Sequence, residues 1–196
     1  IDRIDINAYA SYVNSIGGNI RLEVGEQDSL TYIAAEKLFM RGDNDGARRS
    51  LINYLQTFPE GAFSSNANFY LGSIAFAKKE FDEAIQRFKS VIASGDTKFL
   101  EESVARTAEI EYLSKDYPAA LESFKRLQIV AENPENRQAA RLGIMRCALQ
   151  TGQQKDALLA ADELLKEPKL SPELEAEARY VRAKAYIAQK QANKAL

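Results

Sequence analysis

The chain has 196 residues, of which 45% are hydrophobic and 28% are charged, and its formal net charge is −2. With 26 basic and 28 acidic side chains, it has no charge excess that would favour nucleic acid or an anionic membrane surface. It contains no histidine and a single cysteine, Cys147, which excludes histidine-dependent catalytic triads and dyads, histidine-ligated metal sites and an internal disulfide framework. No apolar stretch approaches the roughly 20 residues that a membrane-spanning helix needs.

The first 26 residues do not follow the pattern of the rest of the chain. Residues 6–16 predict the last helix of an earlier repeat, which Gly17 and Gly18 would end. Residues 20–24 then alternate between apolar and polar side chains, as an extended segment does. We therefore expect residues 1–26 to be the tail of a preceding helix followed by an extended linker that packs along the rest.

From residue 27 onward the sequence repeats itself at intervals of 36–38 residues. Segments 43–55, 79–91, 115–127 and 152–164 each carry an alanine followed four residues later by a larger or apolar residue, and a fifth copy begins at 191–196. The shared alanines are Ala47, Ala84, Ala120, Ala157 and Ala195. A second series lies 12 positions upstream of them and consists of Ala35, Gly72, Ala108, Met145 and Ala183.

This pattern predicts a helix, a turn and a second helix in every copy. Apolar residues recur at steps of three and four, as in amphipathic helices, and small residues let two helices approach closely. Turn signals such as Gly42, Pro118 and Gly152 separate the two helices. The predicted hairpins span 28–62, 65–96, 98–132, 134–169 and 172–196, and the last one stops just inside its second helix. An ordinary helical bundle is the alternative, but the near-constant spacing favours stacked repeats.

These copies resemble the tetratricopeptide repeat (TPR) family over residues 28–196. In the second copy, Leu71, Gly72, Ala75, Ala84 and Phe88 look like the small and large positions of that family. The chain departs from the family in having no Trp and in a period longer than the usual ~34 residues. The resemblance implies an all-α fold, a right-handed α-α superhelix that forms a TPR-like solenoid of about five helical hairpins. We expect the chain to be part of a larger multi-repeat protein.

The resemblance also implies that the first helix of each repeat lines a concave groove. Exposed aromatic rings in such a groove would anchor a partner, and its charged residues would orient that partner. The alternative for each ring is that it packs between repeats. The groove positions, copy by copy, are Tyr32, Glu36, Phe39, Phe69, Ser73, Phe76, Ala105, Glu109, Tyr112, Leu142, Arg146, Leu149, Tyr180, Lys184 and Ile187. All of these except Ala105, Leu142 and Ile187 are predicted partner contacts.

No residue pattern indicates catalysis, and we expect no catalytic residue, no cofactor and no metal. Cys147 is predicted to be a buried packing thiol, because no base or cation that would activate it lies near it in the helical pattern. The neighbouring acids Glu101 and Glu102 are predicted to lie on a solvated helix surface, since adjacent residues do not share a helix face.

The leading functional hypothesis is a protein-protein interaction scaffold that binds a partner peptide or helix in the groove. The alternative is a structural component of a bacterial envelope assembly, or a self-associating repeat array. A third possibility, an enzyme or a glycan-binding protein, would need residues that the chain does not show. The style of the repeats resembles that of bacterial envelope proteins, which suggests a periplasmic or outer-membrane location, with the cytoplasm as the alternative. The sequence leaves the oligomeric state open.

Overall fold

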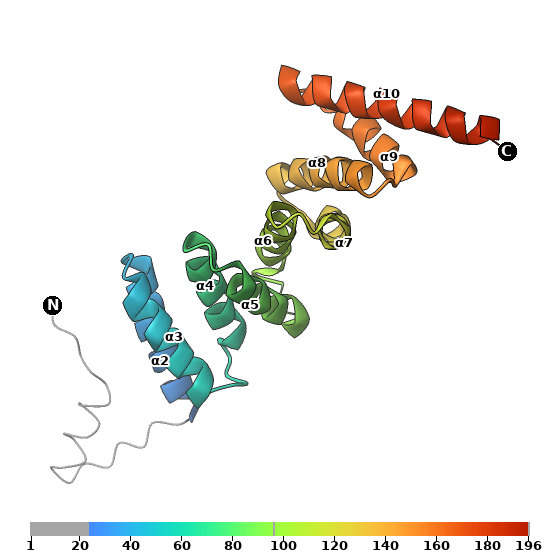
Figure 1. Cartoon of the computed structure of the whole chain (residues 1–196). Coiled ribbons are helices and arrows are strands. Elements are labelled where there is room, and N and C mark those ends of the chain that lie inside the picture. Colours follow the sequence, from blue (N-terminus) through green and yellow to red (C-terminus); the bar gives the residue numbers. More distant parts are fainter. Residues whose placement is uncertain (1–23, 96, 196) are drawn as a thin grey trace, which may run out of the picture. The chain divides into compact units, whose positions relative to one another are not determined.

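A computed structural model describes residues 24–95 and 97–195 of the chain, and every regular element within them is an α-helix (Figure 1). Of the predicted helix tail and linker at 1–26, only residues 24–26 lie inside the described part, where they open the first helix. The helices are α2 (Val24–Met40), α3 (Asn44–Thr57), α4 (Ser64–Ala77), α5 (Phe81–Ser94), α6 (Leu100–Leu113), α7 (Tyr117–Val130), α8 (Pro134–Gln150), α9 (Gln154–Leu164) and α10 (Pro172–Ala195).

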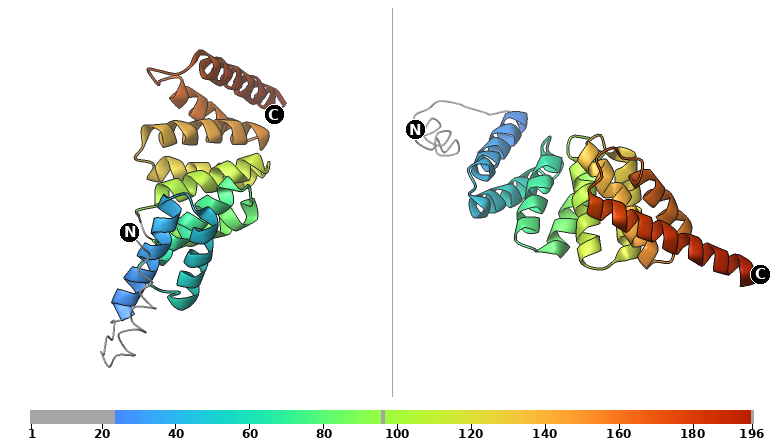
Figure 2. Two further views of the ribbon diagram at one scale, coloured as in Figure 1. Left: turned by 90° about the vertical axis from the view of Figure 1, so that its left-hand side faces the viewer. Right: turned by 90° about the horizontal axis from the view of Figure 1, so that it is seen from above.

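The described residues divide into two compact units, one that ends at residue 78 and one that begins at residue 79. In the first unit, α2 and α3 form a hairpin, and α4 packs against both. In the second unit, each helix from α5 to α10 packs against the next, α6 also contacts α8, and α8 also contacts α10. Figure 2 shows α8, α9 and α10 lying layer upon layer within this unit. The predicted all-α fold of stacked helical hairpins is confirmed.

A left-handed backbone residue follows each of α2, α4, α6 and α8, two residues after the helix ends. Positive φ angles occur at Gly42 (79°), Lys79 (62°), Lys115 (62°) and Gly152 (75°), at intervals of 36 or 37 residues. Such a residue commonly ends a helix, and glycine adopts this conformation without the steric cost that a side chain adds. Two of the four positions are lysines, so the turn repeats in geometry although its residue type does not.

Most small residues of the repeat pattern are buried in the core of each unit. Ala35 and Ala47 in the first unit, and Ala108, Ala120 and Ala157 in the second, are completely buried. They lie beside larger buried side chains, which include Leu51, Tyr54, Leu121, Leu127 and Met145. Small residues at these points allow the backbones to approach, and the large residues fill the space between turns.

The end of the described chain differs from the prediction. Residues 172–195 form one continuous helix, α10, with no turn near residue 190. The segment contains no glycine, and its only proline stands at the helix start, so nothing in the local sequence breaks the helix. As a result Ala183 is exposed, whereas Ala108 and Met145 at the equivalent positions are buried.

Candidate partner-binding site

The groove positions of α2 are mostly occupied by contacts inside the first unit. Tyr32 is only 2% exposed, and its ring stacks on Phe63 with centroids 4.4 Å apart and planes 2° apart. Its hydroxyl donates to Glu36 Oε1 (2.6 Å) and accepts from Asn66 Nδ2 (3.1 Å). The prediction that Tyr32 contacts a partner is therefore wrong, because the ring packs between helices of the unit itself.

Glu36 is held by a second phenol of the same unit. The Tyr70 hydroxyl donates to Glu36 Oε1 at 3.0 Å, and Phe39 packs on the Tyr70 ring at 4.6 Å between centroids. Burial raises the pKa of Tyr32 and of Tyr70, and their hydrogen bonds to Glu36 add to both increases. Both phenols therefore stay protonated and act as donors to the carboxylate.

The groove positions of α4 also lie in the first unit and are half-buried. The Phe69 ring lies 5.7 Å from that of Tyr70 in an edge-on arrangement. The Ser73 hydroxyl donates to the backbone oxygen of Phe69 at 2.9 Å, and Phe76 lies one helical turn further along. These three side chains are therefore partly exposed, and none of them lines the pocket described next.

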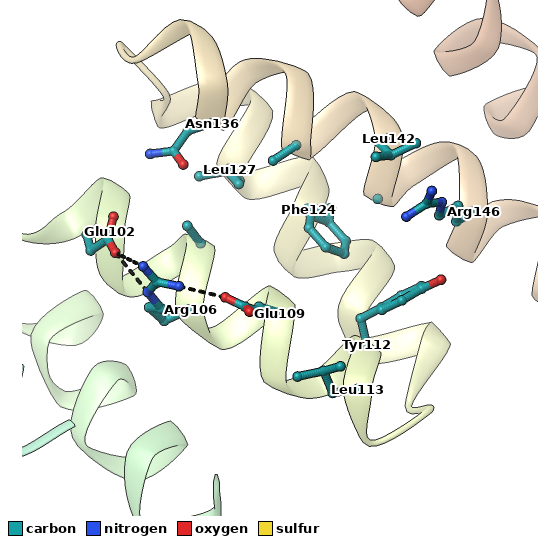
Figure 3. A pocket seen from close by; sticks show the side chains of 13 residues that line it. Glu102, Arg106, Glu109, Tyr112, Leu113, Phe124, Leu127, Asn136, Leu142 and Arg146 are labelled. Carbon is teal, nitrogen blue, oxygen red and sulfur yellow. Dashed lines mark hydrogen bonds and ion pairs between the residues drawn. The ribbon is translucent and has the colours of Figure 1, made fainter. Parts of the chain in front are cut away.

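A pocket of about 260 Å³ lies in the second unit, between α6, α7 and α8 (Figure 3). Groove positions from two successive repeats, on α6 and α8, lie in its lining. The pocket is lined by Glu102, Ala105, Arg106, Glu109, Tyr112, Leu113, Phe124, Leu127, Asn136, Ala139, Leu142, Gly143 and Arg146.

The floor of the pocket is apolar. Phe124 and Leu127 come from α7 and lie behind the opening, between the walls formed by α6 and α8 (Figure 3). Phe124 can lie there because residue 143 is a glycine: a Cβ atom on Gly143 would come within 2.4 Å of the Phe124 ring. Tyr112 meets the Phe124 ring edge-on, with centroids 6.4 Å apart.

The rim of the pocket carries charges that are paired within the protein. Arg106 donates to Glu102 Oε1 through Nε (2.8 Å) and to Glu109 Oε2 through Nη1 (2.8 Å), so one guanidinium serves two carboxylates. Arg146 donates from Nε and Nη2 to the two carboxylate oxygens of Glu177 on α10, both at 2.7 Å. The hydrogen bond to Glu177 is the main cause that raises the pKa of Arg146.

The structure brings together three of the predicted contacts, Glu109, Tyr112 and Arg146, and leaves the others elsewhere. Leu149 lies on α8 but outside the pocket lining. Tyr180 and Lys184 lie exposed on α10, with Lys184 Nζ 6.0 Å from the centre of the Tyr180 ring.

Sequence reasoning missed the other charged or polar lining residues, Glu102, Arg106 and Asn136. The i, i+4 and i, i+3 spacing of Glu102, Arg106 and Glu109 on one helix face could have shown the charge cluster. Nothing in the sequence places Asn136, on α8, beside them. The adjacent acids Glu101 and Glu102 lie in different surroundings. Glu102 lines the pocket, whereas Glu101 lies outside its lining. Glu101 accepts hydrogen bonds from the backbone nitrogens of Glu132 (2.9 Å) and Asn133 (3.1 Å), just before α8.

Three further features of the described residues concern catalysis, metal binding and membranes. Cys147 is completely buried, and burial raises the pKa of its thiol to about 11, which disfavours the reactive thiolate. Within the described part of the chain, no cluster of three or more His, Cys, Asp or Glu could hold a metal ion. None of the described helices combines the length and the apolar character needed to cross a membrane.

Comparisons with known proteins identify a similar family and similar folds. The model of the tetratricopeptide repeat family matches residues 34–97. Among solved structures, YrrB, described as a TPR protein with an unusual peptide-binding site, is 19% identical with a TM-score of 0.62, over 84% of this chain and 79% of that one. A tetratricopeptide repeat protein from Parabacteroides merdae is 17% identical with a TM-score of 0.63, over 85% of this chain and 63% of that one. MamA is 18% identical with a TM-score of 0.60, over 87% and 92%. No curated protein sequence matches the chain.

Proposed function

Because the model of the tetratricopeptide repeat family matches residues 34–97 and the fold resembles that of solved TPR proteins, we propose that this chain is a member of that family and that it binds a peptide segment of a partner protein at the pocket between α6, α7 and α8. Proteins of this family generally act as interaction scaffolds rather than as enzymes. The proposal therefore concerns where on this chain a partner segment binds and which side chains contact it.

The observation that carries the proposal is the combination of an apolar floor with a charged rim. A recess of about 260 Å³ lies below the roughly 300–1,000 Å³ typical of pockets for whole small molecules, which suits one protruding side chain better. Phe124 and Leu127 offer that side chain an apolar surface, and burying a large apolar group there would supply much of the binding free energy. The rim offers polar partners to the peptide on either side.

The test uses a displayed library of random peptides, selected on the immobilised chain. Ala139 lines the pocket and is exposed, so Ala139→Trp would fill the opening without a buried clash. Ala93→Trp is the matched control, because Ala93 is an exposed alanine on α5 outside the pocket lining. We expect the selected peptides to bind the original chain and the Ala93 variant alike, and to lose about tenfold or more in affinity for the Ala139 variant.

Equal binding to all three proteins would refute a role for this pocket. Circular dichroism melting curves must first show that both tryptophan variants keep the stability of the original chain.

A second candidate function, self-association as part of a structural assembly, is supported by α10. Tyr180, Tyr186 and Ile187 are 62%, 53% and 59% exposed, and exposed apolar side chains that gather on one helix can mark an interaction site. The equivalent of Tyr186 in α8, Ala148, is completely buried. A second copy that covered this face would remove these side chains from water.

Light scattering at increasing concentration tests the second candidate. We expect the mass to rise with concentration and Tyr186→Ser to abolish the rise, with Glu173→Ser on the same helix as the control. A constant monomer mass would exclude it. A periplasmic or outer-membrane location, proposed with this candidate, would be tested by fractionating cells that produce the tagged protein.

A further inference from the structure

We propose that the pocket between α6, α7 and α8 selects a peptide segment in which one large apolar residue is flanked by lysine or arginine. This inference rests on the proposed function and specifies the chemistry of the partner. It follows from the size of the recess, from the balance of charge on its rim and from the spacing of the two rim carboxylates.

The size and the apolar lining of the recess determine which residue of the peptide enters it. Ala105 and Ala139 contribute only methyl groups to the walls, while Leu127 and Leu142 contribute branched apolar side chains. With the Phe124 ring at the base, the recess offers apolar contact on several sides. A phenylalanine or leucine of the partner gains more from this surface than an alanine does, because the apolar area removed from water is larger.

The charge on the rim of the pocket determines which residues of the peptide can flank the apolar one. Glu102 and Glu109 are 40% and 45% exposed at their side chains and share the single guanidinium of Arg106. Each uses one oxygen for Arg106, and the other oxygen accepts no hydrogen bond from the described residues. Arg146 is neutralised by both oxygens of Glu177. The α6 side of the pocket therefore has one carboxylate in excess, and it attracts a cation rather than an anion.

The spacing of the carboxylates allows a basic residue on each side of the apolar one. Glu102 and Glu109 lie seven residues apart on α6, which is about 10 Å along a helix axis. The two neighbours of a residue in an extended peptide lie about 7 Å apart. Their side chains leave the backbone on the face opposite to the apolar residue, and lysine or arginine side chains are long enough to curve back and reach the two carboxylates.

The experiment measures binding of three synthetic peptides by the methyl NMR signals of Leu127, Leu142, Ala105 and Ala139 in the full chain. The peptides share the frame acetyl-Gly-Ser-x-z-x-Ser-Gly-amide, with Lys-Phe-Lys, Glu-Phe-Glu or Lys-Ala-Lys at its centre. We expect the Lys-Phe-Lys peptide to shift the pocket signals with about fivefold higher affinity than Glu-Phe-Glu, as two partly exposed ion pairs would give. We expect an advantage of about tenfold or more over Lys-Ala-Lys, from the lost apolar contact.

A pair of double variants tests the source of the preference. In Glu102→Gln/Glu109→Gln, the Lys-Phe-Lys and Glu-Phe-Glu peptides should bind with nearly equal affinity. In the control Glu122→Gln/Glu132→Gln, whose exposed acids lie outside the pocket, the preference should persist. Melting curves of all variants confirm that they fold.

Two results would overturn this inference and leave the proposed function standing. One is equal binding of Lys-Phe-Lys and Glu-Phe-Glu at the pocket of the original chain. The other is that peptides selected from the random library shift the pocket signals but carry no basic residue beside their apolar one. If neither the selected nor the synthetic peptides shift these signals, both the inference and the proposed function fail.

Discussion

The two units carry the same kind of helix, yet the first groove position is filled by an aromatic ring in one unit and lines a pocket in the other. The first groove position of α2 is Tyr32, whose buried ring stacks on Phe63 within the first unit. The equivalent position in α6 is Ala105, which lines the pocket of the second unit. An aromatic ring fills its own site from within, and a methyl group leaves space for a side chain from outside.

Glu36 and Glu109, the acids at the central groove position of α2 and α6, also differ in how far contacts within their own unit occupy them. Glu36 receives two phenol hydroxyls of its own unit, whereas Glu109 shares one guanidinium with Glu102 and remains 45% exposed at its side chain. A position in the repeat therefore does not determine whether its residue belongs to the core or to a binding surface. The side chains that surround it in the folded unit decide.

The largest expected effect comes from removing the ring beneath the pocket. Phe124→Ala should lower the free energy of unfolding by about 3–5 kcal/mol, since it leaves a cavity among α6, α7 and α8. Denaturation in urea measures the change. Ile129→Ala, on the same helix but 84% exposed, is the control and should change stability by less than about 0.5 kcal/mol. Equal effects of the two variants would show that Phe124 is not part of the core of the second unit.

The second-largest expected effect is a loss of stability of the first unit at alkaline pH. Burial and the hydrogen bond to Asp28 raise the pKa of Tyr54 to about 12, from 10.0 in the unfolded chain. The folded first unit holds this proton more tightly than the unfolded chain does. The stabilisation is therefore complete below pH 10 and is lost as the pH rises from 10 to 12, by about 2–3 kcal/mol.

Unfolding free energies measured across this pH range check the effect, with phenolate absorbance as a direct monitor of ionisation. Tyr54→Phe is the matched variant and should reduce the loss of stability over the same range. If the variant and the original chain lose stability equally, Tyr54 is not the group responsible.

An intermediate effect on peptide affinity should follow when the tyrosine of the first unit is introduced at the equivalent position of the second unit. Ala105→Tyr places a phenol at the position where Tyr32 stands in α2, and its ring should occupy the pocket. We expect the affinity for library-selected peptides to fall about tenfold, equivalent to about 1.4 kcal/mol. Ala93→Tyr is the control, since Ala93 lies outside the pocket lining. Unchanged peptide affinity in the Ala105 variant would contradict the comparison between the units.

The smallest effect concerns the turns, which the two units share. Lys115 has φ of 62°, a conformation that costs a side-chain-bearing residue about 1–2 kcal/mol and glycine little. Lys115→Gly should therefore raise thermal stability by up to about 1 kcal/mol, after part of the gain is offset by the greater freedom of glycine in the unfolded chain. Gly152→Ala, with φ of 75° at the equivalent turn, should lower it by a similar amount. Calorimetric melting of both variants measures the difference, and changes of the same sign would refute the shared turn geometry.

Most of the fold could be predicted from the sequence, because it depends on local and periodic features. Alanines such as Ala47, Ala84 and Ala120 repeat with the helical hairpins and are buried as the pattern requires. The site could be predicted only in part. The repeat positions place Glu109, Tyr112 and Arg146 in one groove, and the structure brings them into the lining of one pocket, but the same rule does not show that Phe63 lies against the ring of Tyr32.

The sequence by itself determined that helices form, where most of them turn and which small residues lie between them, since these follow from the spacing of residues along one chain. Only the tertiary structure decided which groove position opens into a pocket and which charges are already paired, such as Arg146 with Glu177 thirty-one residues away. Volume and charge at a site are sums over side chains from several helices, and spacing within one helix does not contain them.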